Sequence, residues 1–143
     1  MIVLDTTVLA YSMGSEHRFR DPCRNLIGAI EAGEVRATTT PEVVQEFCHV
    51  RARRRGRDDA ASLAGAFAEL LSPLVAVDRA ALDRGLGIFA ATPALGAFDS
   101  VLAAVALEAE AAMVVSADRA FADVSGLRVI QPDADGVAAL LRG

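Results

Sequence analysis

The sequence contains no lysine and no tryptophan, and only two of its 143 residues are cysteines. With no tryptophan and few other aromatic residues, the core must be built mainly from alanine, leucine and valine. Cys23 and Cys48 lie far apart and form neither a CxxC pair nor a Cys/His ligand spacing, which argues against a zinc site. Isolated thiols on predicted helices are typical of a reducing compartment, so we expect a cytoplasmic protein.

Long apolar runs are also missing. No stretch of the chain is long and apolar enough to predict a membrane-spanning helix. The N-terminus has no positively charged region and reaches Asp5 after a few apolar residues, so it does not resemble a signal peptide. Hydrophobic residues make up 53% and charged residues 23% of the chain, which indicates a globular protein. We expect residues 1–143 to form a single domain with no membrane partner.

The charge of the chain is unevenly distributed. All 14 basic residues are arginines, and the formal net charge is −5, which by itself argues against a nucleic-acid partner. Five of the arginines, however, fall between Arg51 and Arg57. Such a cluster can hold a phosphate backbone while metal ions neutralise an acidic pocket. It can equally be a solvated helix end that is favourable to the helix dipole.

Short apolar segments typical of buried strands alternate with segments of helical periodicity. The expected strands cover residues 2–4, 35–39, 74–77, 113–116 and 127–130. The expected helices cover residues 8–13, 21–32, 41–55, 58–71, 79–89, 98–111 and 133–141. Asp21, Thr40 and either Asp133 or Asp135 are expected to cap three of these helices. The alternation predicts an α/β fold with a mostly parallel sheet covered on both faces.

Four acidic residues stand out by their positions. Asp5 follows the first strand and Asp118 follows the fourth, at the carboxyl ends where ligands bind in open α/β sheets. Asp99 lies near the start of a strongly apolar helix, and Glu46 lies beside the apolar face of another. Buried carboxylates need a partner, and one cation can serve several of them. All-oxygen ligation favours Mg²⁺ or Mn²⁺ over zinc.

Each acid, taken singly, also has a plain structural explanation. Asp99 could be only a helix N-cap, and Asp118 could cap a short helix. Glu46 could be a solvated helix residue, and Asp5 could bind only the backbone amides of the following turn. The coincidence of all four acids at one end of one predicted sheet favours a shared site.

Four segments of the chain resemble PIN-domain proteins, and within that family VapC-type toxins of toxin–antitoxin pairs. They are Val3-Leu4-Asp5-Thr6, Thr40-Pro41-Glu42-Val43-Val44-Gln45-Glu46, Phe98-Asp99-Ser100-Val101-Leu102-Ala103-Ala104 and Val114-Val115-Ser116-Ala117-Asp118-Arg119-Ala120-Phe121. Their order and spacing carry the resemblance, which covers essentially the whole chain.

The resemblance implies a three-layer α/β/α sandwich with a five-stranded, mostly parallel sheet in the order 3-2-1-4-5. It also implies divalent-metal-dependent cleavage of RNA, with Mg²⁺ as the cofactor and Mn²⁺ as a substitute. Thr6 matches a hydroxyl that supports the first acid, and Ser116 matches a Ser/Thr position near the last. The acidic quartet that would bind metal and catalyse cleavage falls on Asp5, Glu46, Asp99 and Asp118.

The resemblance further implies a cognate antitoxin that holds the protein inactive, and a homodimer. The arginine cluster supplies the candidate RNA contacts, namely Arg51, Arg53, Arg54 and Arg55, and it could also contact an acidic partner segment or be only a solvated helix end. His49 follows Glu46 at an ExxH spacing, but no second such pair exists, so we expect it on a helix surface. Asp123 is expected to be a loop or capping residue.

Other phosphoryl-transfer folds fit less well. Receiver domains and haloacid-dehalogenase-like enzymes also place acids at strand ends, but they use a lysine that this chain lacks, and Thr7 stands where the latter have a second aspartate. A dinucleotide-binding domain would need a glycine-rich turn after the first strand. The surviving alternative to a nuclease is a catalytically inactive PIN-like module that binds RNA or protein.

Overall fold

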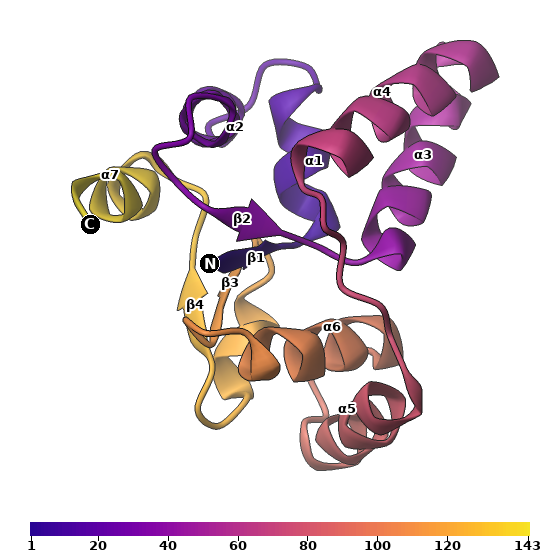
Figure 1. Ribbon diagram of the computed structural model, residues 1–143, viewed down its shortest axis with the longest axis vertical. Helices are drawn as coiled ribbons and strands as arrows, with labels where there is room; N and C mark the ends of the chain where they lie inside the picture. The colour runs from indigo at the N-terminus through magenta and orange to yellow at the C-terminus, as the bar shows by residue number, and fades with distance from the viewer.

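A computed structural model describes all residues, 1–143, and its centre is a parallel four-stranded sheet. The strands lie in the order β2-β1-β3-β4 (Figure 1). Their bounds are β1 (Ile2–Leu4), β2 (Ala37–Thr38), β3 (Met113–Val115) and β4 (Arg128–Ile130). Strands β1 and β3 are buried along their whole length, as expected for central strands of a sheet that is covered on both faces.

Helices lie on both sides of this sheet, which confirms the predicted three-layer α/β/α arrangement. In Figure 1, α5 and α6 lie on one side and α1, α2 and α7 on the other, with the α3–α4 pair beside them. None of the helices is long and apolar enough to cross a membrane. The helix bounds are α1 (Thr6–Ser12), α2 (Arg20–Glu31), α3 (Pro41–Arg55), α4 (Arg57–Leu70), α5 (Arg79–Ala91), α6 (Ala97–Glu108), the 3₁₀ helix η1 (Arg119–Asp123) and α7 (Ala134–Arg142).

The prediction of a fifth strand over residues 74–77 is wrong, although the order of the other four strands is as expected. This segment forms only one backbone hydrogen bond near β2, from the Val75 amide to the carbonyl of Thr39, the residue that follows the strand, at 2.9 Å. The preceding carbonyl, that of Pro73, accepts a hydrogen bond from the Thr38 hydroxyl at 2.9 Å instead of from a backbone amide. Because β2 has only two residues, it cannot template a further ladder.

Two of the predicted helix caps are confirmed and one is wrong. Thr40 precedes α3, and its hydroxyl accepts a hydrogen bond from the Val43 amide; Asp133 caps α7 in the same way. Asp21 is not a cap, because α2 begins one residue before it and Asp21 lies in the first helical turn. A carboxylate in that position still complements the helix dipole.

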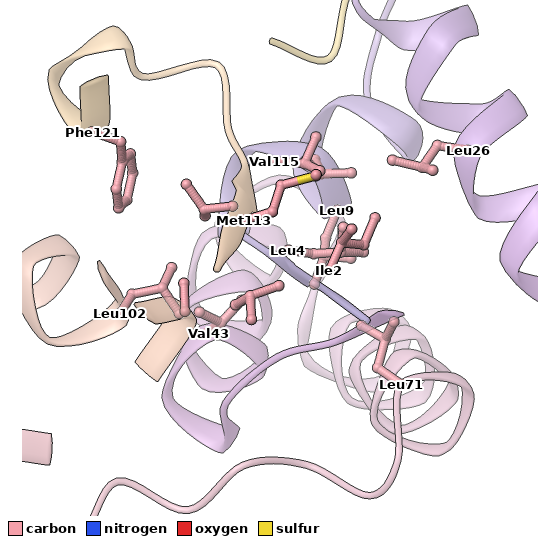
Figure 2. Packing of buried hydrophobic residues seen from close by; sticks show 14 of the residues in the cluster. Ile2, Leu4, Leu9, Leu26, Val43, Leu71, Leu102, Met113, Val115 and Phe121 are labelled. Atoms are coloured by element: carbon pink, nitrogen blue, oxygen red, sulfur yellow. The ribbon is translucent and has the colours of Figure 1, made fainter. Parts of the chain in front are cut away.

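The hydrophobic core contains one cluster of 26 buried residues that joins the sheet to the helices on both faces (Figure 2). Valine and leucine dominate it, as the composition predicts, whereas alanine contributes fewer members than phenylalanine. Its aromatic members are few, but Phe47 of α3 and Phe67 of α4 meet edge to face with ring centroids 5.1 Å apart. The carboxyl ends of β1 and β3 are therefore held on a rigid base.

Two glycines of α5 offer a test of how closely α5 and α6 pack. A Cβ atom added to Gly85 would lie 2.6 Å from Cγ2 and 2.7 Å from Cα of Val101 in α6, whereas one added to Gly87 would meet nothing within 4 Å. We expect Gly85→Ala to destabilise the protein by about 1–3 kcal/mol, because the backbone of α6 must move. Gly87→Ala should instead stabilise it, by up to about 1 kcal/mol, through helix propensity.

Urea unfolding of both variants measures these opposite effects. If the two variants have equal stability, the close packing of α5 against α6 is incorrect.

Candidate active site

Asp5 is the buried centre of the site. It ends β1 and caps α1, and only 4% of its surface is exposed. One carboxylate oxygen, Oδ1, accepts a hydrogen bond from the Thr6 amide at 2.7 Å. The other, Oδ2, accepts hydrogen bonds from the hydroxyls of Ser116 at 2.6 Å and Thr7 at 3.1 Å. Burial raises the pKa of Asp5 above its ordinary value, although these hydrogen bonds oppose the increase.

Ser116 and Thr7 connect Asp5 to the end of β3. The Ser116 hydroxyl, which donates to Asp5, accepts a hydrogen bond from the Asp118 amide at 3.0 Å. The Thr7 hydroxyl likewise donates to Asp5 and accepts from the Ala117 amide at 3.0 Å. The two hydroxyls therefore hold the ends of two neighbouring strands in a fixed relation.

Glu46 reaches this region from α3, where its side chain is exposed. The Thr6 hydroxyl donates a hydrogen bond to Oε2 of Glu46 at 2.7 Å. The negative charge of Glu46 contributes to raising the pKa of Asp5, which shows that the two carboxylates lie near each other. Thr6 thus supports Asp5 with its amide and Glu46 with its hydroxyl.

Asp99 completes the group from the first turn of α6. Burial is the main cause that raises the pKa of Asp99 to about 7, followed by the charges of Asp5, Asp118 and Glu46. Asp118 is exposed, and its carboxylate also caps η1 by accepting a hydrogen bond from the Ala120 amide at 2.9 Å. The structure thus places the four predicted acids, from four different parts of the chain, within one electrostatic neighbourhood.

The four acids are not arranged as a finished metal centre. No group of three or more histidine, cysteine, aspartate or glutamate side chains lies close enough together to hold a metal ion. The structure shows a buried, hydrogen-bonded aspartate, Asp5, and a half-buried one, Asp99. Burial raises the pKa of both, and the charges of neighbouring carboxylates raise it further.

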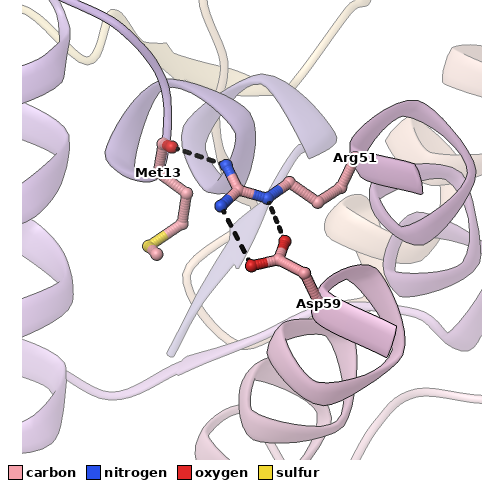
Figure 3. Close-up of polar contacts among 3 residues, drawn as sticks. All are labelled: Met13, Arg51 and Asp59. Carbon is pink, nitrogen blue, oxygen red and sulfur yellow. Dashed lines mark hydrogen bonds and ion pairs between the residues drawn. The ribbon is translucent and has the colours of Figure 1, made fainter. Parts of the chain in front are cut away.

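The arginine cluster divides into one fixed and several free side chains. Arg51 is only 14% exposed, and its guanidinium donates hydrogen bonds to the Asp59 carboxylate of α4 and to the Met13 carbonyl at the end of α1 (Figure 3). Arg53, Arg54 and Arg55 are exposed in the last turn of α3 and form no side-chain hydrogen bond or ion pair. The main role of Arg51 is therefore to connect α3 to α4 and to the end of α1.

Sequence reasoning named Thr6 and Ser116 as auxiliary residues but missed Thr7, whose hydroxyl is the second side-chain donor to Asp5. The signal was present as two consecutive hydroxyl residues directly after a strand-end aspartate. His49 is exposed on α3, as expected for a helix-surface residue. Asp123 is the last residue of η1 and is exposed.

Comparison with known proteins agrees with this architecture. The family model described as PIN domain matches residues 2–127, and the chain therefore belongs to the PIN-domain family. Within that family it is of the VapC type. It is 53% identical to Ribonuclease VapC7 of Mycobacterium tuberculosis, over 99% of this chain and 98% of that protein. It is also 23% identical to Ribonuclease VapC13 of M. tuberculosis and to VapC ribonuclease Mb1869c of Mycobacterium bovis, over 90% of this chain and 98% of each relative.

Proposed function

We propose that this protein is an endoribonuclease and the toxin of a toxin–antitoxin pair, and that it hydrolyses RNA phosphodiester bonds at the four-carboxylate site. The observation that carries the proposal is the convergence of Asp5, Glu46 and Asp118 on Asp99, whose pKa their charges raise. Full-length similarity to proteins named ribonucleases supports the RNA substrate. The alternative, an inactive PIN-like binding module, is disfavoured because all four acids are present.

The residues of the site fit a hard divalent cation. All of the candidate donors are carboxylate oxygens, which Mg²⁺ and Mn²⁺ prefer. The raised pKa values of Asp5 and Asp99 reflect burial and mutual repulsion, both of which a nearby cation offsets. We therefore propose Mg²⁺, with Mn²⁺ as a substitute, held by Asp5, Glu46, Asp99 and Asp118. When bound, such an ion makes water a better nucleophile and stabilises charge on the phosphate.

The residues of this chain then have separate tasks. Thr6, Thr7 and Ser116 fix both oxygens of Asp5, and their three hydrogen bonds leave one lone pair of Oδ1 free for a cation. Asp118 lies on the exposed side of the site, where RNA can approach. Because burial and neighbouring charges raise the pKa of Asp99 to about 7, Asp99 is partly protonated near neutral pH, and the protonated form must release its proton before it can bind a cation.

The arginines at the end of α3 are proposed to hold the RNA backbone. Arg53, Arg54 and Arg55 are exposed and form no ion pair, which suits them for phosphate contacts. Arg51 would act mainly by positioning this helix end, since its guanidinium is already engaged by Asp59 and Met13.

We also propose three properties of the protein in the cell. A cognate antitoxin protein would inhibit it, as in toxin–antitoxin pairs. A homodimer is supported by exposed apolar side chains on α5 and α6, namely Leu82, Leu86, Phe89 and Phe98. A cytoplasmic location is supported by Cys23 and Cys48, which are free thiols.

Metal removal tests the catalytic proposal. We expect a mixture of transfer, ribosomal and messenger RNA to be cut in the presence of Mg²⁺, and cleavage to stop when excess chelator is added. Gel analysis should show that added Mg²⁺ or Mn²⁺ restores the same products. Cleavage that continues in chelator would refute the metal mechanism, and RNA binding without cleavage under any ion would favour the inactive binding module.

A further inference from the structure

A pocket of about 420 Å³ opens beside the acidic site, between α1, the loop that follows it and the C-terminal half of α3. Thr7 lies in its wall and its hydroxyl donates a hydrogen bond to Asp5, so the pocket adjoins the acidic site at Thr7. The residues of its wall that matter here are Thr7, Tyr11, His17, Arg51 and Arg54. The four-carboxylate site does not use Tyr11, His17 or Arg54.

The pocket contains an aromatic stack that is already ordered. The rings of Tyr11 and His17 are stacked, with centroids 4.4 Å apart and an interplanar angle of 25°, and buried Phe19 meets both rings edge-on. His17 is exposed, but its ring is oriented because Nδ1 accepts a hydrogen bond from the Phe19 amide at 3.1 Å. Exposed aromatic rings of this kind stack with the unpaired bases of RNA. Since the ring is already oriented, a base would bind with little ordering cost.

The pocket wall carries two arginines, Arg51 and Arg54, and one acidic residue, Glu16. The Arg51 guanidinium is held by Asp59 and Met13 and forms a rigid part of the wall (Figure 3). Arg54, one turn further along α3, is exposed and has no acidic partner. An aromatic platform next to an unpaired guanidinium suits a base and its phosphate better than an apolar peptide.

We infer that this pocket binds one unstacked base of single-stranded RNA beside the cleaved bond. The base stacks on His17, and Arg54 contacts an adjacent phosphate. The inference rests on the proposed function, because it assigns a substrate contact to the same site. It adds a subsite that selects unpaired RNA at the acidic centre.

Binding of RNA in the presence of chelator tests the subsite without cleavage. A fluorescently labelled single-stranded RNA of mixed sequence serves as the probe, with fluorescence anisotropy as the readout. We expect His17→Ala to weaken binding about tenfold, which is the effect of losing one stacked base. Arg54→Ala should weaken binding several-fold. It should also reduce the slope of log affinity against log salt concentration by about one, which corresponds to one phosphate contact.

Matched controls come from the same chain. His49→Ala replaces the other histidine, which is exposed on α3 and is not part of the pocket wall. Arg36→Ala removes an exposed arginine next to the amino end of β2, on the opposite edge of the sheet from the acids. Both controls should bind the RNA as the unmodified protein does, and all four variants should keep its melting temperature.

A series of probes, each with an abasic residue at one position, identifies the bound base. For the unmodified protein, an abasic residue at one position of the RNA should weaken binding. For His17→Ala, the same abasic residue should cause no further loss of affinity, because the two changes remove the same contact. The inference would be overturned if His17→Ala bound RNA as tightly as the unmodified protein. It would also be overturned if the affinity lost through His17→Ala and that lost through the abasic residue were additive. Either result would leave the pocket as a protein contact. RNA that depends on His17 for binding but is never cut with Mg²⁺ would overturn only the nuclease proposal.

Discussion

Asp5→Asn is expected to reduce RNA cleavage about a thousand-fold or more while the protein remains folded. The substitution removes the negative charge of the only fully buried acid of the site, and several kcal/mol of metal-dependent transition-state stabilisation should be lost with it. The fold should tolerate asparagine because its Oδ1 can still accept the hydrogen bond from the Thr6 amide. Its Nδ2 can donate to the second lone pair of the Ser116 and Thr7 hydroxyls, each of which already accepts from a backbone amide, and only the two hydroxyl protons lose their acceptor.

Asp123→Asn is the matched control for this prediction. Asp123 is exposed at the end of η1 and has no bond to the site, so its variant should cleave RNA at the unmodified rate. Initial cleavage rates at saturating Mg²⁺ and circular dichroism spectra provide the comparison. An Asp5→Asn protein that keeps its full cleavage rate with Mg²⁺ would show that the acidic site is not the catalytic centre.

Most of the helices and strands could be predicted from the sequence of each segment alone, because the apolar pattern of each segment agrees with the part of it that is buried in the fold. The segment over residues 74–77 shows where this fails. Its apolar composition is that of a strand, but strand formation depends on a neighbour that offers a ladder of free backbone groups. Only the carbonyl of Thr39, just after β2, accepts a backbone hydrogen bond from this segment, and the Thr38 hydroxyl donates to the Pro73 carbonyl. That information lies in the partner strand and not in the segment itself.

The acids of the site could be predicted because parallel topology places strand ends together, so Asp5 and Asp118 had to be neighbours. The hydrogen bonds that the hydroxyls of Thr6, Thr7 and Ser116 donate to the acids could not be predicted, because they depend on side-chain rotamers. Thr6 was expected to support Asp5 with its hydroxyl, but that hydroxyl donates to Glu46, and Thr7 takes the expected place. The position of the Arg51 guanidinium could not be predicted either, because its partner Asp59 lies in the next helix.

Asp99→Asn is expected to stop cleavage and, in the absence of metal, to make the protein more stable. Burial and three neighbouring acids raise the pKa of Asp99 to about 7, far above its ordinary value of 3.8. Between about pH 4 and about pH 7 the folded protein therefore keeps a proton on Asp99 that the unfolded chain releases. As the pH rises through this range, the ionisation of Asp99 increasingly destabilises the fold. This increase in pKa corresponds to at most roughly 4 kcal/mol. Solvent screening of the half-buried group lowers the expected gain from asparagine to about 1–2 kcal/mol at pH 8.

Thermal unfolding at several pH values, in chelator and in Mg²⁺, measures this gain. In chelator the Asp99→Asn protein should melt about 3–8 °C higher than the unmodified protein at pH 8, and the difference should vanish near pH 4. Mg²⁺ should stabilise the unmodified protein more than the variant, because the cation relieves the repulsion that asparagine has already removed. Asp21→Asn removes a carboxylate from the first turn of another helix, α2, and should slightly lower stability instead. A lower melting temperature of Asp99→Asn at pH 8 would mean that Asp99 ionises without opposition, and that the four carboxylates do not share one site.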